Sequence, residues 1–151
     1  IMATKVLMVC LGNICRSPLA EGIFRHLANH QEYIVDSAGT ANYHTGALPD
    51  RRSIAAAAKN GVDISDQRAR QFTASDLNVF DHILVMDEQN KLDVLALCTT
   101  DEQRRKIDLL TLASAHDTTH VPDPYYGNEK DFDAVYALVY ECCKNWLAKR
   151  K

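Results

Sequence analysis

The chain has 151 residues and is 46% hydrophobic, so it is long enough to bury a proper core, and its formal net charge of −3 provides no basic field for nucleic acid or an anionic membrane. No stretch is long and apolar enough to span a bilayer, and the start shows no signal-peptide pattern. Ile1 precedes Met2 and is interpreted as a remnant of cloning, and one domain is expected over residues 2–151.

Apolar runs alternate with helix-like periods along the chain, which predicts an α/β domain with a parallel sheet. Residues 4–9 form the first predicted strand. Ser17 is the expected N-cap of the helix that follows, with Pro18 at the first helical position. Residues 33–35 form the second strand, and a long loop covers residues 40–49.

Cap and stop signals divide the rest of the chain. Asp50 is expected to cap a helix that stops at Gly61, and residues 73–76 have the pattern of a capping box before a short helix. The remaining predicted elements are a third strand over residues 82–86, a helix that is capped by Asp87 and runs to about Cys98, a fourth strand over residues 107–110 and a last helix over residues 129–149.

Polar side chains follow each of the four predicted strands. Cys10 follows the first strand, Ser37 the second and Asp87 the third, and Asp123 lies in the loop after the fourth. Ligands of open α/β sheets bind at the carboxyl ends of the strands. We therefore expect these four side chains to converge on one site.

The segment CLGNICRSP at residues 10–18 has the features of an anion site. Gly12 and Asn13 tolerate positive φ, which lets successive backbone N–H groups point inward. The helix that follows adds the positive end of its dipole. Because such an enclosure favours an anion, we expect Cys10 to be a thiolate and the loop to bind phosphate.

A thiolate that faces a phosphate ester suggests phosphoryl transfer through a cysteinyl phosphate. Arg16 is expected to grip two phosphate oxygens, and the Ser17 hydroxyl to donate to the departing thiolate. Asp123, between Pro122 and Pro124, is the candidate general acid. No metal or cofactor is expected, because the amides and the guanidinium stabilise the charge.

The assignment of Asp123 has alternatives. An Asp-Pro pair is also typical of a simple turn. Tyr125 and Tyr126 favour the catalytic interpretation, because they could wall a slot for an aromatic ring. His116 and His120 are rival acids on a polar loop.

The five cysteines indicate a reducing compartment. Their number is odd and a core of this size needs no disulfides, so a cytoplasmic location is the simplest interpretation. Cys98, Cys142 and Cys143 lie on predicted helices, where a core position is expected. No Cys-x-x-Cys pair is present and the six histidines are scattered, so a zinc site is not expected.

Five motifs make the chain similar to a known family: CLGNICRSP at residues 10–18, DSAGT at 36–40, ARQ at 69–71, MDEQN at 86–90 and DPYYGN at 123–128. The chain resembles the low-molecular-weight protein tyrosine phosphatases over nearly its whole length. The resemblance implies a three-layer, phosphotyrosine phosphatase I-like fold, in which a four-stranded parallel sheet with flavodoxin-like winding has helices on both faces. It also implies hydrolysis of phosphotyrosine in proteins and of small aryl phosphates, with phosphotyrosine-containing proteins and oxyanions as binding partners.

The resemblance implies a role for each matching residue. Cys10 would be the nucleophile, Arg16 the phosphate clamp and Asp123 the acid that later acts as base toward water. Asp87 matches a carboxylate that supports the phosphate loop. Cys15 matches a second cysteine that can form a reversible disulfide with the nucleophile and protect it from over-oxidation.

The family pattern also implies a supporting network and shows two departures. Asn13 would take a left-handed conformation and be held with Ser17 by hydrogen bonds that include Ser37. Some members carry histidine where Gln67 stands, and many carry tryptophan where Tyr43 stands. The expected substrate-binding or phosphate-binding residues are Leu11, Gly12, Asn13, Ile14, Cys15, Ser17, Tyr43, Tyr125 and Tyr126.

Three other functions are weighed against this one. Arsenate reductases share the fold and first loop but need relay cysteines near the third strand, and residues 82–89 contain none. Protein-arginine phosphatases characteristically have threonine where Ile14 stands, and a branched apolar residue suits a flat phenyl ring better. A non-enzymatic phosphate reader would need neither Cys10 nor Asp123.

Overall fold

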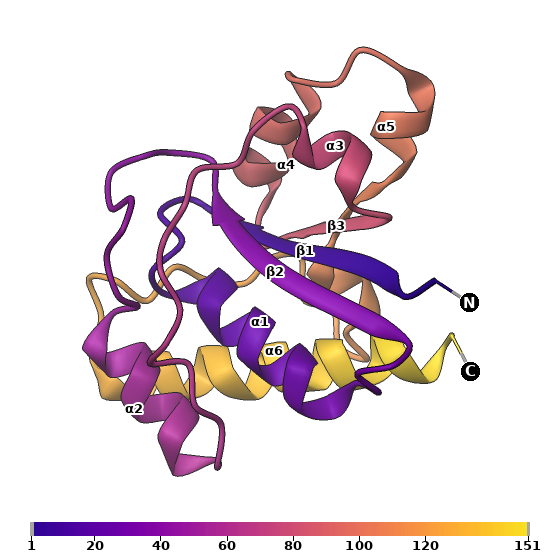
Figure 1. Ribbon diagram of the computed structural model, residues 1–151. Coiled ribbons are helices and arrows are strands. Elements are labelled where there is room, and N and C mark those ends of the chain that lie inside the picture. The colour runs from indigo at the N-terminus through magenta and orange to yellow at the C-terminus, as the bar shows by residue number, and fades with distance from the viewer. Residues whose placement is uncertain (1, 151) are drawn as a thin grey trace.

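The computed structural model describes residues 2–150 and shows one sheet of four parallel strands in the order β2-β1-β3-β4 (Figure 1). The expected α/β class and flavodoxin-like winding are therefore confirmed. Ile1, interpreted above as a remnant of cloning, and Lys151 lie outside the described residues. The strands are β1 (Thr4–Cys10), β2 (Tyr33–Gly39), β3 (His82–Val85) and β4 (Ile107–Leu109).

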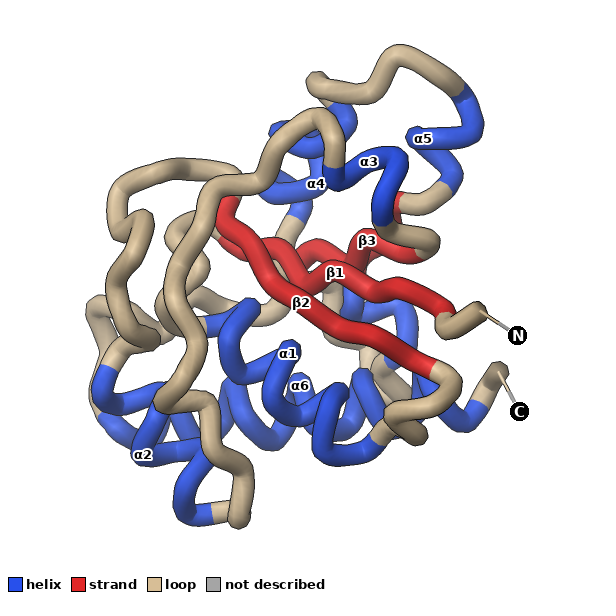
Figure 2. Tube along the Cα trace, in the orientation of Figure 1, coloured by secondary structure: helices blue, strands red, loops and turns tan. Residues whose placement is uncertain are grey.

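Helices cover both faces of this sheet, as Figures 1 and 2 show. None of the helices in residues 2–150 has both the length and the hydrophobicity needed to cross a membrane. One face carries α1 (Arg16–Leu27), α2 (Arg51–Lys59) and α6 (Glu129–Ala148), and the other carries α3 (Asp76–Val79), α4 (Glu88–Leu95) and α5 (Asp101–Arg105), while a short 3-10 helix, η1 (Leu110–Ala113), follows β4.

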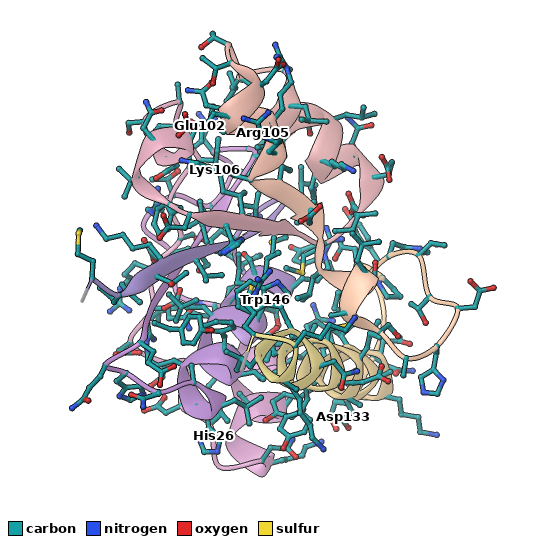
Figure 3. The ribbon with its side chains drawn as sticks, turned by 90° about the vertical axis from the view of Figure 1, so that its right-hand side faces the viewer. His26, Glu102, Arg105, Lys106, Asp133 and Trp146 are labelled. Atoms are coloured by element: carbon teal, nitrogen blue, oxygen red, sulfur yellow. The ribbon has the colours of Figure 1, made fainter. Side chains whose placement is uncertain are left out.

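The larger part of the core lies between the sheet and the α1–α6 layer. The Trp146 ring packs at 5.6 Å from Phe24 and at 5.1 Å from His82, centroid to centroid, and Figure 3 shows it beside the sheet. Full burial of one such apolar side chain contributes about 1.5–3 kcal/mol. The expected apolar face of α6 is confirmed, because Phe132 and Val139 are fully buried along it.

The first βα unit differs from expectation in two places. β2 continues to Gly39 rather than ending at Val35, because residues 36–39 pair in register with β1. α1 begins at Arg16, and its N-cap is Cys15 without a side-chain bond, so the prediction of Ser17 as the cap is wrong. The Ser17 hydroxyl instead forms a hydrogen bond with Cys10 Sγ. Pro18 is tolerated in the first helical turn, because N–H groups there lack intrahelical partners.

The other caps are mostly as expected. The Asp50 carboxylate accepts from the Arg52 N–H, and Asp87 forms a capping box with Asn90. The predicted capping box before α3 is only half formed: the Asp76 carboxylate accepts from the Thr73 N–H at 2.9 Å, but Ser75 is the N-cap and its side chain makes no capping bond. The chain after α4 contains a separate helix, α5, which sequence periodicity does not predict.

Candidate active site

A cavity of about 180 Å³ opens at the carboxyl ends of β1 and β2, the edge at which Figure 2 shows the connecting loops gathering. Most of the predicted site residues line this cavity, whereas Asn13, Ser17, Ser37 and Asp87 do not line it and support the residues that do. The cavity is lined by Cys10, Leu11, Gly12, Ile14, Cys15, Arg16, Tyr43, His44, Asp123, Tyr125 and Tyr126.

The phosphate loop, residues 10–17, wraps around the Cys10 sulfur. The Asn13 N–H donates to Cys10 Sγ at 3.3 Å, and Ser17 Oγ lies 3.0 Å from the same sulfur. Asn13 has φ of 56°, as expected. Gly12 does not share this positive φ, which corrects one expectation: Asn13 alone reverses the backbone here. Within residues 2–150, the backbone N–H groups of Gly12 and Ile14 donate to no protein group, which leaves them free for an anion.

A buried hydrogen-bond chain sets the direction of the Ser17 hydroxyl. The Asn13 side-chain amide donates to Ser17 Oγ at 2.7 Å and to Ser37 Oγ at 3.0 Å. The Ser37 hydroxyl donates onward to Glu21 Oε1 at 2.6 Å. Because Ser17 Oγ accepts from Asn13, its own proton is free to point at Cys10 Sγ.

Glu21 is a buried carboxyl at the end of this series of hydrogen bonds, and the sequence analysis does not identify it. Burial raises its pKa, against the hydrogen bond from Ser37 and the charge of Arg25. Arg25 Nη2 lies 2.7 Å from Glu21 Oε2. Gln67 stands where some family members carry histidine. Its side-chain amide donates to the Pro18 carbonyl at 3.1 Å, and none of its hydrogen bonds reaches Asn13, Ser17, Ser37 or Glu21.

Arg16 is held rigidly at the floor of the cavity. Its side chain is 3% exposed, and Nη1 donates to Asp87 Oδ2 at 2.6 Å and to the Val121 carbonyl at 3.0 Å. Asp87 uses its other oxygen to accept from the Asn90 N–H at 2.8 Å. Asp87 therefore ties the guanidinium to the start of α4, and its contact with the phosphate loop is through Arg16.

Asp123 begins the acid loop, residues 123–128, and uses its two oxygens differently. Oδ1 accepts from the Tyr125 N–H at 3.1 Å, which is the turn geometry of the alternative interpretation. Oδ2 lies 3.9 Å from Arg16 Nη2, on the cavity side. The turn and the catalytic interpretation are thus compatible, because the turn aims the second oxygen.

Aromatic side chains form the rim. Tyr125 and Tyr126 meet edge to face at 5.0 Å between ring centroids, and Tyr126 is almost fully exposed. Tyr43 is also exposed at the rim. His44 is a lining residue that sequence reasoning does not place in the site; its ring lies 6.4 Å from that of Tyr125. The sequence signal for a place in the site is that His44 directly follows Tyr43, an expected substrate-binding residue.

The four cysteines other than Cys10 differ in where they lie. Burial is the main cause that raises the pKa of Cys15 to about 12, so this lining residue is a thiol at neutral pH. Cys142 and Cys143 are buried in the larger part of the core, and Cys98 is partly buried against a smaller apolar cluster that includes Leu77 of α3 and Val94 of α4. In the part of the chain that the structure describes, no third cysteine lines the cavity.

The rival acids lie elsewhere. His116 is exposed and faces Glu141 at 3.5 Å, and neither His116 nor His120 lines the cavity. Residues 2–150 contain no group of three His, Cys, Asp or Glu side chains placed to hold a metal ion.

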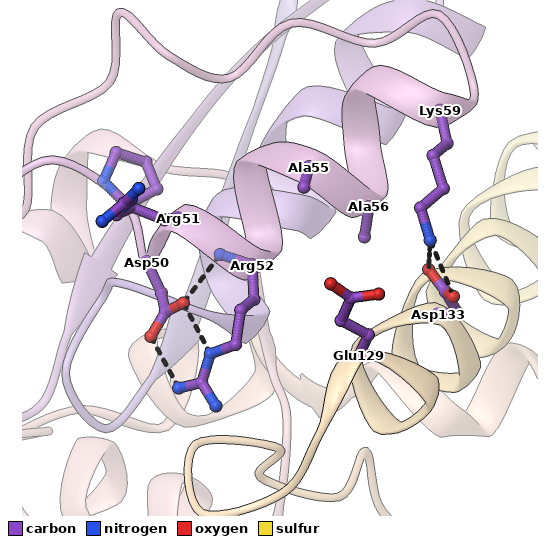
Figure 4. A pocket seen from close by; sticks show the side chains of 9 residues that line it. Asp50, Arg51, Arg52, Ala55, Ala56, Lys59, Glu129 and Asp133 are labelled. Atoms are coloured by element: carbon purple, nitrogen blue, oxygen red, sulfur yellow. Dashed lines mark hydrogen bonds and ion pairs between the residues drawn. The ribbon is translucent and has the colours of Figure 1, made fainter.

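A second cavity, of about 660 Å³, lies between α2 and the start of α6 (Figure 4). Its lysine and one arginine are already paired, Lys59 with Asp133 at 3.0 Å and Arg52 with Asp50 at 2.9 Å. It contains no cysteine, serine or histidine. The chemistry therefore belongs to the smaller cavity.

Comparison with known proteins identifies a matching family model and similar sequences. A family model described as low molecular weight phosphotyrosine protein phosphatase matches residues 5–151. A low molecular weight phosphotyrosine protein phosphatase of Gallus gallus is 42% identical over 150 residues, which cover 96% of this chain and 94% of the relative.

Two solved structures have similar folds. One is a protein tyrosine phosphatase from Entamoeba histolytica with Hepes in the active site, with a TM-score of 0.90, 38% identity and coverage of 98% of this chain and 97% of the other. The other is an arginine phosphatase from Drosophila, with a TM-score of 0.92, 33% identity and coverage of 98% of both chains.

Proposed function

The chain belongs to the low molecular weight phosphotyrosine protein phosphatase family, and from that premise we propose that it hydrolyses protein phosphotyrosine and small aryl phosphates through a phosphorylated Cys10. One observation carries the proposal: a thiol, a buried guanidinium and a carboxyl face the same 180 Å³ cavity. All five cysteines are free, which supports a reducing, cytoplasmic location.

In the first step, the Cys10 thiolate attacks phosphorus, an S–P bond forms and the bond to the phenolic oxygen breaks. Asp123, protonated, gives its proton to the departing phenolate. Arg16 and the free N–H groups of the phosphate loop bind the equatorial oxygens, which flatten in the transition state. Asp87 and the Val121 carbonyl hold the guanidinium in place for this contact.

In the second step, water attacks the phosphocysteine and Asp123, now a carboxylate, takes its proton. The S–P bond breaks, and inorganic phosphate and the Cys10 thiolate are released. The Ser17 hydroxyl donates to the departing sulfur, because Asn13 occupies its acceptor side. This hydrogen bond stabilises the negative charge on the departing sulfur and makes the thiolate a better leaving group.

Substrate choice is proposed to rest on the rim. Ile14 and Tyr125 offer apolar contact to a flat phenyl ring. A second candidate substrate is phosphoarginine, because the fold is also similar to that of an arginine phosphatase at 33% identity. Rates on phosphotyrosine, phosphoserine, phosphoarginine and arsenate distinguish these functions. We expect phosphotyrosine to be hydrolysed fastest; faster turnover of phosphoarginine, or arsenate reduction, would contradict the proposal.

The acid is tested by the substitution Asp123→Ala. Loss of the proton donor should lower kcat/KM for phenyl phosphate, which has a poor leaving group, by about 10²–10⁴-fold. The loss for 4-nitrophenyl phosphate should be much smaller, because that phenolate leaves without protonation. Equal losses on both substrates would remove Asp123 from this role.

A further inference from the structure

Arg52, the second residue of α2, is clamped at the helix start by a bidentate ion pair. Its Nε donates to Asp50 Oδ1 at 3.0 Å and its Nη2 to Asp50 Oδ2 at 2.9 Å, as Figure 4 shows. Asp50 itself is tied to the phosphate loop, because its N–H donates to the Ile14 carbonyl at 2.7 Å. The guanidinium therefore has a fixed place relative to that loop.

The same guanidinium reaches the acid loop, more than 70 residues away in the chain. Nη1 donates to the Gly127 carbonyl at 3.1 Å, and Nη2 donates to the Tyr125 carbonyl at 2.9 Å. Within residues 2–150, these are the hydrogen bonds that join residues 123–127 to another element. The other bonds of this segment run inside it, from Gly127 to Pro124 and from Tyr125 to Asp123.

Aromatic rings enclose the guanidinium. Its central carbon lies 4.4 Å from the centroid of Phe132, a fully buried residue of α6, and 5.8 Å from that of Tyr125. Cation–π contacts of this kind are stronger for arginine than for lysine, because the planar group can stack. Three elements, α2, α6 and the acid loop, thus meet at one side chain.

We propose that Arg52 is a positioning residue, which holds the acid loop so that Asp123 meets the leaving oxygen; this inference rests on the proposed function. The ion pair fixes Arg52 to the phosphate-loop side, and its two bonds to backbone carbonyls fix the acid loop. A shift of about 1 Å in a catalytic group is enough for large losses of rate. Arg52 does not line the 180 Å³ cavity that contains Cys10, so it acts through the acid loop and not on the substrate.

The test compares Arg52→Met with Arg51→Met. Methionine keeps apolar contact with Phe132 but removes the bonds to Asp50 and to the acid loop. Arg51 is the matched control, because it is the exposed neighbour on the same helix. We expect Arg52→Met to lower kcat/KM for phenyl phosphate roughly 10- to 100-fold more than for 4-nitrophenyl phosphate. Arg51→Met should leave kcat/KM for both substrates unchanged. Arg52→Lys should restore part of the activity that Arg52→Met loses.

A double variant separates positioning from mere support of the fold. In an Asp123→Ala background, Arg52→Met should add no further dependence on the leaving group, because no acid remains to be positioned. Cys10 alkylation by iodoacetate and its protection by inorganic phosphate should be unchanged in Arg52→Met. Equal losses on both substrates, or a loss that adds to that of Asp123→Ala, would overturn the inference. Failure of the proposed function would give a different result, because Asp123→Ala alone would then show no dependence on the leaving group.

Discussion

Replacement of Gly39 by alanine is predicted to displace the phosphate loop, although Gly39 lies outside it. Gly39 ends β2 and pairs with Cys10. An added Cβ would lie 2.7 Å from the Leu11 carbonyl oxygen and 3.0 Å from the Asn13 nitrogen. Position 39 cannot retreat, because its N–H donates to the Arg70 carbonyl and its carbonyl accepts from Phe72, at 2.9 and 2.7 Å. The loop must therefore move.

The size of the effect follows from this overlap. Overpacking against atoms that cannot rotate away costs about 1–3 kcal/mol. If the displaced loop carries this strain, its N–H groups no longer converge on the anion. Each 1.4 kcal/mol is a factor of ten, so the affinity for inorganic phosphate should fall by roughly 5- to 150-fold.

The measurement is the rate at which iodoacetate alkylates Cys10 at increasing phosphate concentration, which yields the Kd of phosphate from protection. Gly22→Ala is the control, because its Cβ would meet the side chains of Ile64, Val62 and Gln67 rather than loop backbone. We expect the control to change stability and leave the Kd near that of the unmodified chain. An unchanged Kd in Gly39→Ala, or an equal loss in Gly22→Ala, would refute the reasoning.

Three further predictions concern the sulfurs and a buried acid. Cys10→Ser should lower turnover of aryl phosphates by more than about 10³-fold while calorimetry still detects phosphate binding; retained turnover would reject Cys10 as nucleophile. Peroxide should link Cys10 reversibly to Cys15, and mass mapping that finds Cys10 over-oxidised beside a free Cys15 would reject protection. The raised pKa of Glu21 means that the folded chain holds its proton more tightly than the unfolded chain, so the free energy of unfolding should fall as pH rises from about 4.3, the ordinary value, through the raised one. Urea unfolding should show this fall weakened in Glu21→Gln, and an identical fall in both proteins would contradict the assignment.

Local signals in the sequence predicted the order of strands and helices well. Apolar runs and caps are read within a few residues, which is why Asp50 and Asp87 were recognised as helix caps. The convergence of Cys10, Asp87 and Asp123 also followed from the sequence, because parallel strands end at a common edge.

Competition from tertiary contacts explains what local rules predicted wrongly. Ser17 is a good N-cap by type, but its oxygen accepts from Asn13 and faces Cys10 instead. Thr100 has the capping-box pattern with Gln103, but the short helix that it starts has too few residues for a periodic signal.

The sequence by itself determined the chemistry of the phosphate loop and the succession of elements, because both depend on neighbours along the chain. Only the tertiary structure decided that Glu21 ends the hydrogen-bond chain, that Gly39 touches the loop and that Arg52 joins α2 to the acid loop. Those contacts link residues from 16 to 75 positions apart. They arise from how the strands and helices pack, and no local periodicity or propensity specifies which distant backbone a side chain will meet.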